Sequence, residues 1–434
     1  MNKLKNNMEA KYVYIQDQQY ETIPELAEIQ INNRVLKCPF YGTSVRSDID
    51  IQSLKNVVAS KKLKNTQVVA YGLGDAENFK NQLSKTIFEF TGENLDYKPF
   101  SEFIITIDPV GEYLLRNVSS EVEKLISIKD IPDYLKDILQ AETKDRKKLI
   151  KDLFNENTKI SGVIEWYLNK AMSLNAEIGI PLCIPISGET TLNYAIKTNR
   201  LATTIQQDNG WQKAVFFLLE FKSFKDETLI NTILKSINIL KPNIVVFKVL
   251  NPKFLEPDCR LERSILDVFL KGLYNYRLRE KALTFALNCD VSLYHYMAQG
   301  LCGAIEPIDG NYNTDIRYNG KKVDLEEKPK DEYKNFGKYP DPITLDEKSF
   351  KTLRIVNGNT KQPFPCGCPE CSKYKTFVTD SYQYNRIRRM HRIHIRDEFV
   401  SELKESFYKN NLRASMFDRF SEGSKLSVFK SYYS

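Results

Sequence analysis

Three cysteines stand close together in the C-terminal part of the chain. They are Cys366, Cys368 and Cys371, within the segment PCGCPEC. Thiolates at this spacing can converge on one tetrahedral metal ion, and the fourth ligand must then come from elsewhere in the chain. Only three histidines are present, and two of them, His391 and His394, follow about twenty residues later. The spacing therefore predicts a zinc site with three thiolates and one imidazole.

The two histidines belong to a predicted helix that begins near Arg386 and reads RIRRMHRIHIRDEFVSELKESF. Residues three apart on a helix lie near one face, so either His391 or His394 can complete the site. Four protein ligands leave no open position on the metal. We therefore expect a structural zinc ion, one per chain, and not a catalytic one.

The same helix is basic. From Ser372 to Ser434 the sequence carries 13 Lys and Arg against 7 Asp and Glu, whereas the rest of the chain is nearly neutral. A local surplus of positive charge favours an anionic partner such as a nucleic acid, although a solvated helix face can have the same composition. The candidates for phosphate contact are Arg386, Arg388, Arg389, Arg392 and Arg396.

Eight short apolar runs have the composition of β-strands, and helical patterns lie between most of them. Several runs are apolar nearly throughout, which is typical of strands buried on both faces. This order predicts an α/β fold with a closed, TIM-like (β/α)8 barrel. An open doubly wound sheet is the alternative, and the lack of a glycine-rich loop after the first run counts against it. The runs begin at or near Leu36, Thr66, Phe103, Ile180, Ala214, Asn243, Leu283 and Gly303.

The predicted domain organisation follows from these patterns. Residues 1–35 form an N-terminal segment, and residues 36–310 form the barrel, with a charged helical insertion at about 115–175. Residues 311–360 are charged, contain proline and show little periodicity, so an extended connection is expected there. Residues 361–434 form the basic, zinc-binding helical module.

The remaining features favour a cytoplasmic protein. No apolar run approaches the roughly 18 residues that a membrane span needs. The N-terminal residues MNKLKNNMEAKYVY lack the apolar core of a signal peptide. The cysteines outside the cluster lie mostly in apolar runs and are expected to be buried thiols, not disulfides. They are Cys38, Cys183, Cys259, Cys289 and Cys302.

Eight barrel strands followed by Cys-x-Cys-x-x-Cys and a histidine on a helix resemble the tRNA-guanine transglycosylase superfamily. Members of that superfamily exchange guanine in a nucleic acid for a 7-deazaguanine base. The segment CGCPECSKY is the most specific match. The family's spacing, together with the apolar pattern that follows the helix start, favours His394 over His391 as the fourth ligand.

The resemblance is looser in the strands that carry the family's active site. The stretch LTFALNCDVSLYHYMAQGLCGAIEP is similar to the family's seventh strand, helix and eighth strand. It implies Glu306 as a catalytic carboxylate, with Asp309 and Asp290 as alternatives. FIITIDPVGEY is similar to the third strand and places Asp108 on the family's aspartate, without the Ser-Gly-Gly-Phe-Gln that follows it there. AVFFLLEFK places Glu220 where the family has a base-reading glutamine.

These matches imply a pentosyltransferase that breaks and remakes the N-glycosidic bond at a sugar C1′. Such a reaction has an oxocarbenium-like transition state, in which one carboxylate attacks C1′ and a second group moves the proton. The resemblance makes Glu306 the nucleophile of a covalent glycosyl-enzyme intermediate and Asp108 the acid/base. Glu220 would hydrogen bond the base, and Tyr113 would stack on it.

The altered pocket favours the DNA-acting branch of the superfamily, the DNA-guanine transglycosylases. The expected partners are then DNA and a base such as 7-cyano-7-deazaguanine. The target base must leave the duplex stack to reach the mouth of a barrel. Two alternatives stay open. One is the same exchange on tRNA, and the other is a non-catalytic paralogue that binds nucleic acid or a catalytic partner.

Overall fold

The computed structural model of the protein describes most of the chain between residues 23 and 310 and a long helix near the C-terminus. The longer described stretches are 23–32, 34–59, 63–74, 103–109, 120–250, 259–310, 338–341 and 381–409. The shorter described pieces are 13–14, 87–88, 94–95, 114, 345, 347–348, 368, 371 and 416.

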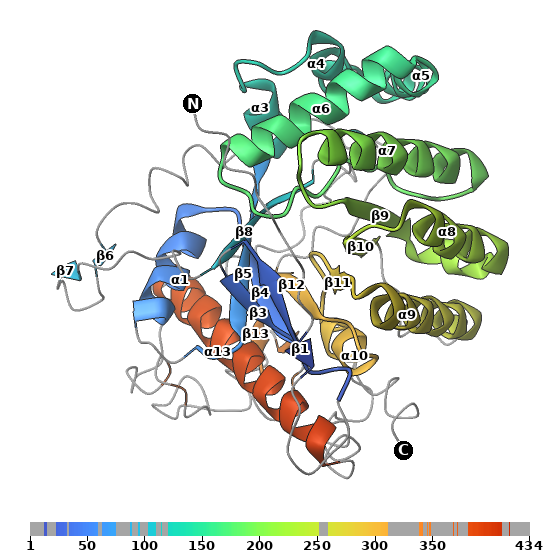
Figure 1. Ribbon diagram of the computed structural model, residues 1–434. Helices are drawn as coiled ribbons and strands as arrows, with labels where there is room; N and C mark the ends of the chain where they lie inside the picture. The colour runs from blue at the N-terminus through green and yellow to red at the C-terminus, as the bar shows by residue number, and fades with distance from the viewer. Residues whose placement is uncertain are drawn as a thin grey trace.

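A curled parallel sheet of seven strands forms the centre of the fold (Figure 1). Its strand order is β8-β5-β4-β12-β11-β10-β9, and every neighbouring pair is parallel. Nearly all of their residues are buried, as the apolar runs predicted. Seven of the eight predicted strands are thereby confirmed. The strands are β4 (Phe40–Val45), β5 (Thr66–Gly72), β8 (Ile104–Asp108), β9 (Ala214–Glu220), β10 (Ile244–Leu250), β11 (Leu283–Ala286) and β12 (Gly303–Pro307).

The remaining predicted strand, near Ile180, is irregular. The segment 176–186 runs between the two edge strands and makes one parallel bridge to each, Thr106 with Ile178 and Ile186 with Leu219. Prolines at positions 181 and 185 explain the irregularity, because proline has no backbone N–H to donate to a ladder. The chain therefore spans the gap between β8 and β9 without forming a regular eighth strand.

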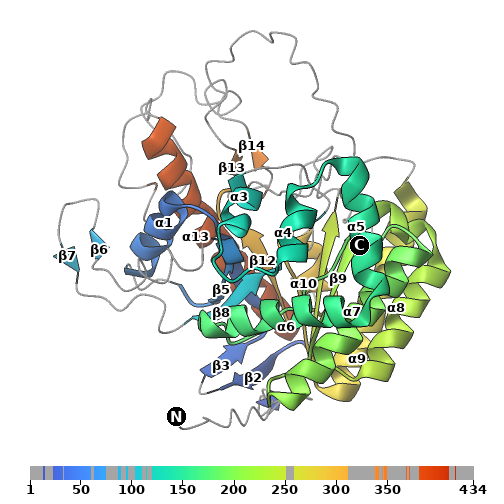
Figure 2. The same cartoon turned by 90° about the horizontal axis from the view of Figure 1, so that it is seen from above.

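Helices lie along the outside of the curled sheet (Figures 1 and 2). The last one, α13, is 28 residues long and packs beside α1 and against β4. It begins more than seventy residues after β12 ends, yet it packs on β4, which comes first of the seven strands in the sequence. These helices are α1 (Asp48–Ala59), α7 (Glu189–Asp208), α8 (Glu227–Leu240), α9 (Arg260–Glu280), α10 (Leu293–Ala298) and α13 (Ser381–Tyr408).

The predicted helical insertion contains consecutive helices, of which α6 packs against α7. They are α3 (Ser120–Ile126), α4 (Asp133–Gln140), α5 (Thr143–Asn155) and α6 (Asn157–Ser173). The short 3-10 helix η2 (Phe221–Lys225) follows β9.

Short antiparallel strands complete the described fold. The N-terminal sheet consists of β1 (Val13–Tyr14), β2 (Ala27–Ile31) and β3 (Arg34–Lys37), and β3 leads directly into β4. It is tied to the helical layer by Arg277 of α9, which donates to the carbonyl oxygens of Pro24 and Glu25. The other pairs are β6 (Ile87–Phe88) with β7 (Asn94–Leu95) and β13 (Tyr339–Pro340) with β14 (Glu347–Lys348).

None of the helices in the described part of the chain is both long and apolar enough to cross a membrane.

Candidate metal centre and candidate active site

Cys368, Cys371 and His391 come together in a compact group whose ligand atoms all lie within 4.8 Å of one another. The Nδ1 atom of His391 is 3.4 Å from the Sγ atom of each cysteine. Ligands on a tetrahedral zinc ion, with Zn–S near 2.3 Å and Zn–N near 2.0 Å, are about 3.5 Å apart. The spacing therefore fits a metal ion held by two thiolates and an imidazole.

The surroundings of His391 orient its ring for such a role. Its Nε2 atom lies 2.7 Å from the carbonyl oxygen of Pro340, which can only accept a hydrogen bond. Nε2 must therefore carry the proton, and the lone pair on Nδ1 points toward the two sulfur atoms. The ring of Tyr339 stacks on the imidazole with centroids 4.2 Å apart. This donor set and tautomer fit zinc.

The geometry favours His391 over His394 as the imidazole ligand. His394 is described by the structure and is almost fully buried, but it does not belong to the group of ligand atoms. The preference for His394 that followed from the family's spacing is therefore corrected. Cys366, the third predicted thiolate, lies outside the described residues.

Four of the five candidate arginines of α13 turn inward, which counts against the prediction that they contact phosphates. Arg388, Arg389, Arg392 and Arg396 are all buried. They are held by groups of the protein itself, so they are not available to an external anion in this arrangement. Arg386 is half-buried and lies over the ring of Tyr382, 5.9 Å from its centroid.

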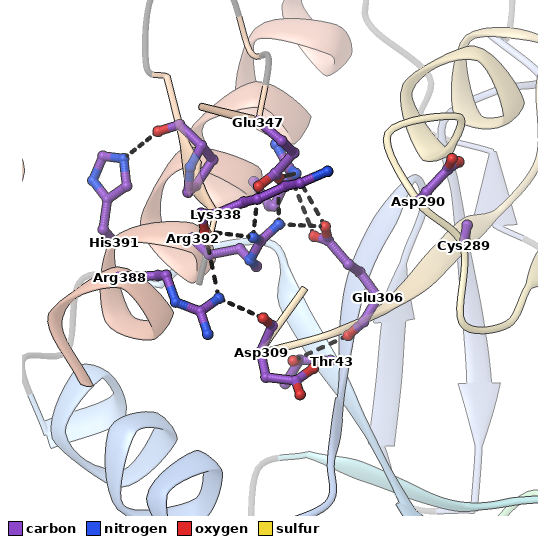
Figure 3. Close-up of polar contacts among 12 residues, drawn as sticks. Thr43, Cys289, Asp290, Glu306, Asp309, Lys338, Glu347, Arg388, His391 and Arg392 are labelled. Carbon is purple, nitrogen blue, oxygen red and sulfur yellow. Dashed lines mark hydrogen bonds and ion pairs between the residues drawn. The ribbon is translucent and has the colours of Figure 1, made fainter. Parts of the chain in front are cut away.

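Glu306 of β12 is the carboxylate that two of these arginines, Arg392 and Arg396, bind (Figure 3). Arg396 binds both of its carboxylate oxygens, at 2.8 and 3.0 Å, and Arg392 binds Oε1 at 2.8 Å. The same two arginines also bind Glu347 of β14. The side chains of Glu306 and both arginines are 0% exposed. We call Glu306, Glu347, Arg392 and Arg396 the ion-pair cluster.

Charge balance explains how this cluster can be buried. Two carboxylates face two guanidinium groups, and each guanidinium group binds both carboxylates, so the buried charges are paired, as buried ions require. Burial alone would lower the pKa of Arg396, but the adjacent Glu306 and Tyr294 raise it well above its ordinary value. The hydroxyl of Tyr41 donates to Glu306 at 3.3 Å, and burial together with that carboxylate raises the pKa of the tyrosine.

The position of Glu306 counts against its predicted role as the nucleophile. A carboxylate that is fully buried and bound by two guanidinium groups cannot reach a sugar carbon in this arrangement. Asp309, an alternative nucleophile, follows β12 and is half-buried, and its backbone carbonyl accepts from Arg388. Asp290, the other alternative, follows β11, accepts from the backbone N–H of Ser292 at 2.9 Å, and lies apart from the ion-pair cluster (Figure 3).

Asp108 is the centre of a second polar group at the carboxyl ends of the parallel strands. Its Oδ2 atom accepts from Asn288 Nδ2 at 2.5 Å and from Arg46 Nη2 at 3.4 Å. Asn288 in turn accepts from Ser44 Oγ at 2.8 Å. These residues come from the ends of β8, β4 and β11, which are not adjacent in the strand order but whose ends meet in the folded protein. We call Asp108, Asn288, Arg46 and Ser44 the Asp108 group.

The two polar groups lie on opposite faces of the sheet. Successive side chains of a strand point to opposite faces. In β4, Tyr41 and Thr43 contact Glu306, whereas Ser44 contacts Asn288 of the Asp108 group. Glu306 therefore faces α13 on the outside, and Asp108 faces the inside of the curled sheet, where barrel active sites lie at the strand ends.

Tyr167 of α6 lies in the electrostatic neighbourhood of Asp108. Its side chain is 0% exposed, and its hydroxyl has no hydrogen-bond partner among the described residues. Burial, and then the negative charge of Asp108, raise the pKa of this tyrosine.

The two predicted base-binding residues have different outcomes. Glu220 ends β9 at the same carboxyl edge as Asp108, is almost fully buried and pairs with Lys222 at 2.8 Å. Tyr113 lies outside the described residues. The structure thus places Glu220 at the predicted edge of the sheet without testing what it binds.

Sequence reasoning missed Arg46, Ser44 and Asn288. Ser44 lies near the end of β4, and Arg46 directly follows that strand. The sequence around them contains no recognised motif. Asn288 left a weak signal, because a polar residue directly after an apolar strand often occupies a left-handed turn. Its φ of 49° agrees with that explanation.

Comparison with known proteins does not assign the chain to a family. A scan against protein-family models finds no match, and a search of the curated proteins finds none either.

Proposed function

We propose that this protein is a base-exchange transglycosylase that replaces guanine in DNA with a 7-deazaguanine. The observation that carries the proposal is the position of α13. The sequence resemblance has a cysteine cluster after the last strand, followed by a helix with a histidine. Here α13 brings His391 to Cys368 and Cys371 while packing on the sheet, so the two halves of the motif meet in space.

A closed barrel completes this proposal. The segment 176–186 makes a parallel bridge to each edge strand of the curled sheet, so it can take the place of an eighth strand. Barrel enzymes keep their reacting groups at the carboxyl ends of the strands. Asp108, Glu220 and the acids after β11 and β12 all belong to that edge.

Zinc is proposed as a structural ion held by Cys368, Cys371 and His391, with Cys366 as the fourth ligand. Its role is to fix α13 to the connection that precedes it. The ion supplies no step of the reaction, because four protein ligands leave no position for a substrate.

Asp108 is proposed as the acid/base, and the nucleophile passes from Glu306 to Asp309 or Asp290. Asp309 lies two residues after the end of β12, the strand on which the resemblance places the attacking carboxylate, and it is the more exposed of the two. Asp290 follows the neighbouring strand β11. Glu220 is proposed to accept hydrogen bonds from the amino group and ring N–H of the purine.

The decisive experiment measures exchange directly. The protein is incubated with DNA or with tRNA and with candidate bases such as 7-cyano-7-deazaguanine, and released nucleosides are identified by mass spectrometry. We expect the new nucleoside in DNA, with loss of the product for Asp108→Asn and for either Asp309→Asn or Asp290→Asn. Product in tRNA alone transfers the proposal to tRNA. No product with either nucleic acid leaves the non-catalytic paralogue as the better explanation.

A further inference from the structure

Asp108 is held asymmetrically. Both of its hydrogen bonds go to Oδ2, one from Asn288 and one from Arg46, and Oδ1 accepts none from the described residues. The side chain is 6% exposed, so it has little freedom to rotate and exchange its two oxygens. The carboxyl group therefore presents two different oxygen atoms, one occupied and one open.

Asn288 is itself fixed from two sides. It is 0% exposed, and its backbone φ of 49° lies in the left-handed region that asparagine tolerates better than most residues. Its Oδ1 atom accepts from the hydroxyl of Ser44, which orients the amide so that Nδ2 faces Asp108. Ser44 is also buried, so little water competes for this contact.

Two donors on Oδ2 determine where a proton on Asp108 must lie. In the ionised acid they bind a carboxylate oxygen, and in the neutral acid they bind the carbonyl-type oxygen. In both states the open position for the proton is Oδ1. Arg46 alone cannot keep Oδ2 occupied, because its Nη2 atom is 3.4 Å from Oδ2, whereas Nδ2 of Asn288 is 2.5 Å from it.

We propose that Asn288, held by Ser44, is a positioning residue that reserves Oδ2 and makes Oδ1 the atom that carries the proton in base exchange. The proposal rests on the proposed transglycosylase function. It names residues of the Asp108 group that the resemblance does not place in the family's active site.

The proton and electron pairs balance over the two half-reactions. A carboxylate oxygen of the nucleophile bonds to C1′ while the C1′–N bond breaks, and the bonding pair leaves with guanine, which takes the proton from Oδ1. The incoming base then attacks C1′ through its ring nitrogen and gives the N–H proton to Oδ1. The ester bond to the nucleophile breaks with its pair returning to the carboxylate, so both acids regain their starting states.

The test compares three variants of the full chain in the exchange assay. Asn288→Gly removes the amide and keeps the left-handed backbone accessible. Ser44→Ala removes only the hydroxyl that orients the amide, and it serves if the glycine variant does not fold. Asn175→Gly is the matched control, since Asn175 is an exposed asparagine at φ 65° after α6.

For Asn288→Gly we expect kcat to fall by roughly tenfold to a hundredfold, with KM for the nucleic acid nearly unchanged. The loss should appear in kcat and not in KM, because the amide acts through Asp108 and not through the bound nucleic acid. Ser44→Ala should show the same changes, smaller, and Asn175→Gly should show none.

The possible results distinguish a failure of the positioning role of Asn288 from a failure of the proposed transglycosylase function. If the unmodified protein exchanges bases and both Asn288→Gly and Ser44→Ala keep its kcat, the positioning role is wrong and the function stands. A fall in kcat with a comparable rise in KM also overturns the role, since that pattern indicates a general loss of packing. If the unmodified protein exchanges no base, the proposed function fails, and this inference fails with it.

Discussion

Asp108 and Glu306 are two acids near the carboxyl ends of parallel strands, and they differ in the face of the sheet that they occupy and in how their oxygens are bound. Glu306 faces α13, is fully buried, and has both oxygens bound by arginines. Asp108 faces the inside of the curled sheet, and among the described residues only its Oδ2 atom is bound. The first acid is part of the packing between sheet and helix, and the second is the acid for which we propose proton transfer.

The difference comes from which face of the strand each side chain occupies. A shift of one position along a strand moves a side chain to the other face. Glu306 pairs in register with Thr43, and Ser44 of the Asp108 group is the next residue of the same strand. To assign a catalytic role to an acid at a strand end, the pairing register of that strand must therefore be known to within one residue.

Loss of the metal should have the largest effect, and it should separate the two regions. Structural zinc contributes on the order of 10 kcal/mol to the folding of small modules. Cys368→Ala should abolish zinc binding, measured as about one zinc per chain in the unmodified protein. Amide hydrogen exchange should then increase in α13 and β12 much more than in β8.

Cys259→Ala is the control for that experiment, because Cys259 is a buried thiol outside the metal group. Zinc should stay bound in this variant. Undamaged protein that contains no zinc would contradict the metal site, and equal exchange in β8 and β12 would contradict the separation of the two regions.

Removing one arginine of the ion-pair cluster should have the next largest effect. Arg396→Ala leaves the Glu306 carboxylate buried with fewer partners, which costs about 3–5 kcal/mol in the free energy of unfolding. Arg386→Ala on the same helix should cost less than about 1 kcal/mol, since Arg386 is half-buried. Denaturant unfolding measures both. Equal losses would mean that the ion-pair cluster has no special role in stability.

Asp108→Asn should reduce activity strongly and stability only slightly. Base exchange should fall by about 10²–10⁴-fold because the proton carrier is lost. The free energy of unfolding should change by only about 1 kcal/mol, because the amide keeps the shape of the side chain and an acceptor oxygen for Asn288. Glu306→Gln should instead reduce stability by several kcal/mol. A stable Glu306→Gln protein without exchange activity would restore Glu306 as the nucleophile.

A third acid at a strand end should give the smallest effect. Glu220 is buried, but its partner Lys222 has a side chain that is 64% exposed. Lys222→Ala should therefore change the free energy of unfolding by less than about 1 kcal/mol, because solvent screens such pairs. A loss as large as that of Arg396→Ala would show that Glu220 depends on its lysine as Glu306 depends on its arginines.

Sequence patterns predicted the sheet better than the site. Apolar runs mark buried strands directly, so seven strands appeared where they were predicted, and only the run near Ile180 failed, because of its prolines. The cysteine spacing predicted a metal group, of which Cys368 and Cys371 are seen with a histidine.

The roles of charged residues were not predictable in the same way. A basic helix has the same composition whether its arginines meet phosphates or buried carboxylates. Arg392 and Arg396 are 86 and 90 residues from Glu306 in the sequence, so no local pattern could identify that contact. Asn288 contacts Asp108 across 180 residues, for the same reason.

The late position of α13 in the chain has a consequence for synthesis. Glu306 leaves the ribosome 90 residues before Arg396, and Asp50 precedes its partner Arg389 by 339 residues. Until α13 emerges, these carboxylates have no cations to join in the interior, and β4 and β12 lack the helix that covers them. Contacts of such long range also slow folding. The nascent sheet should therefore stay open at β4 and β12 and depend on chaperones until the final helix docks.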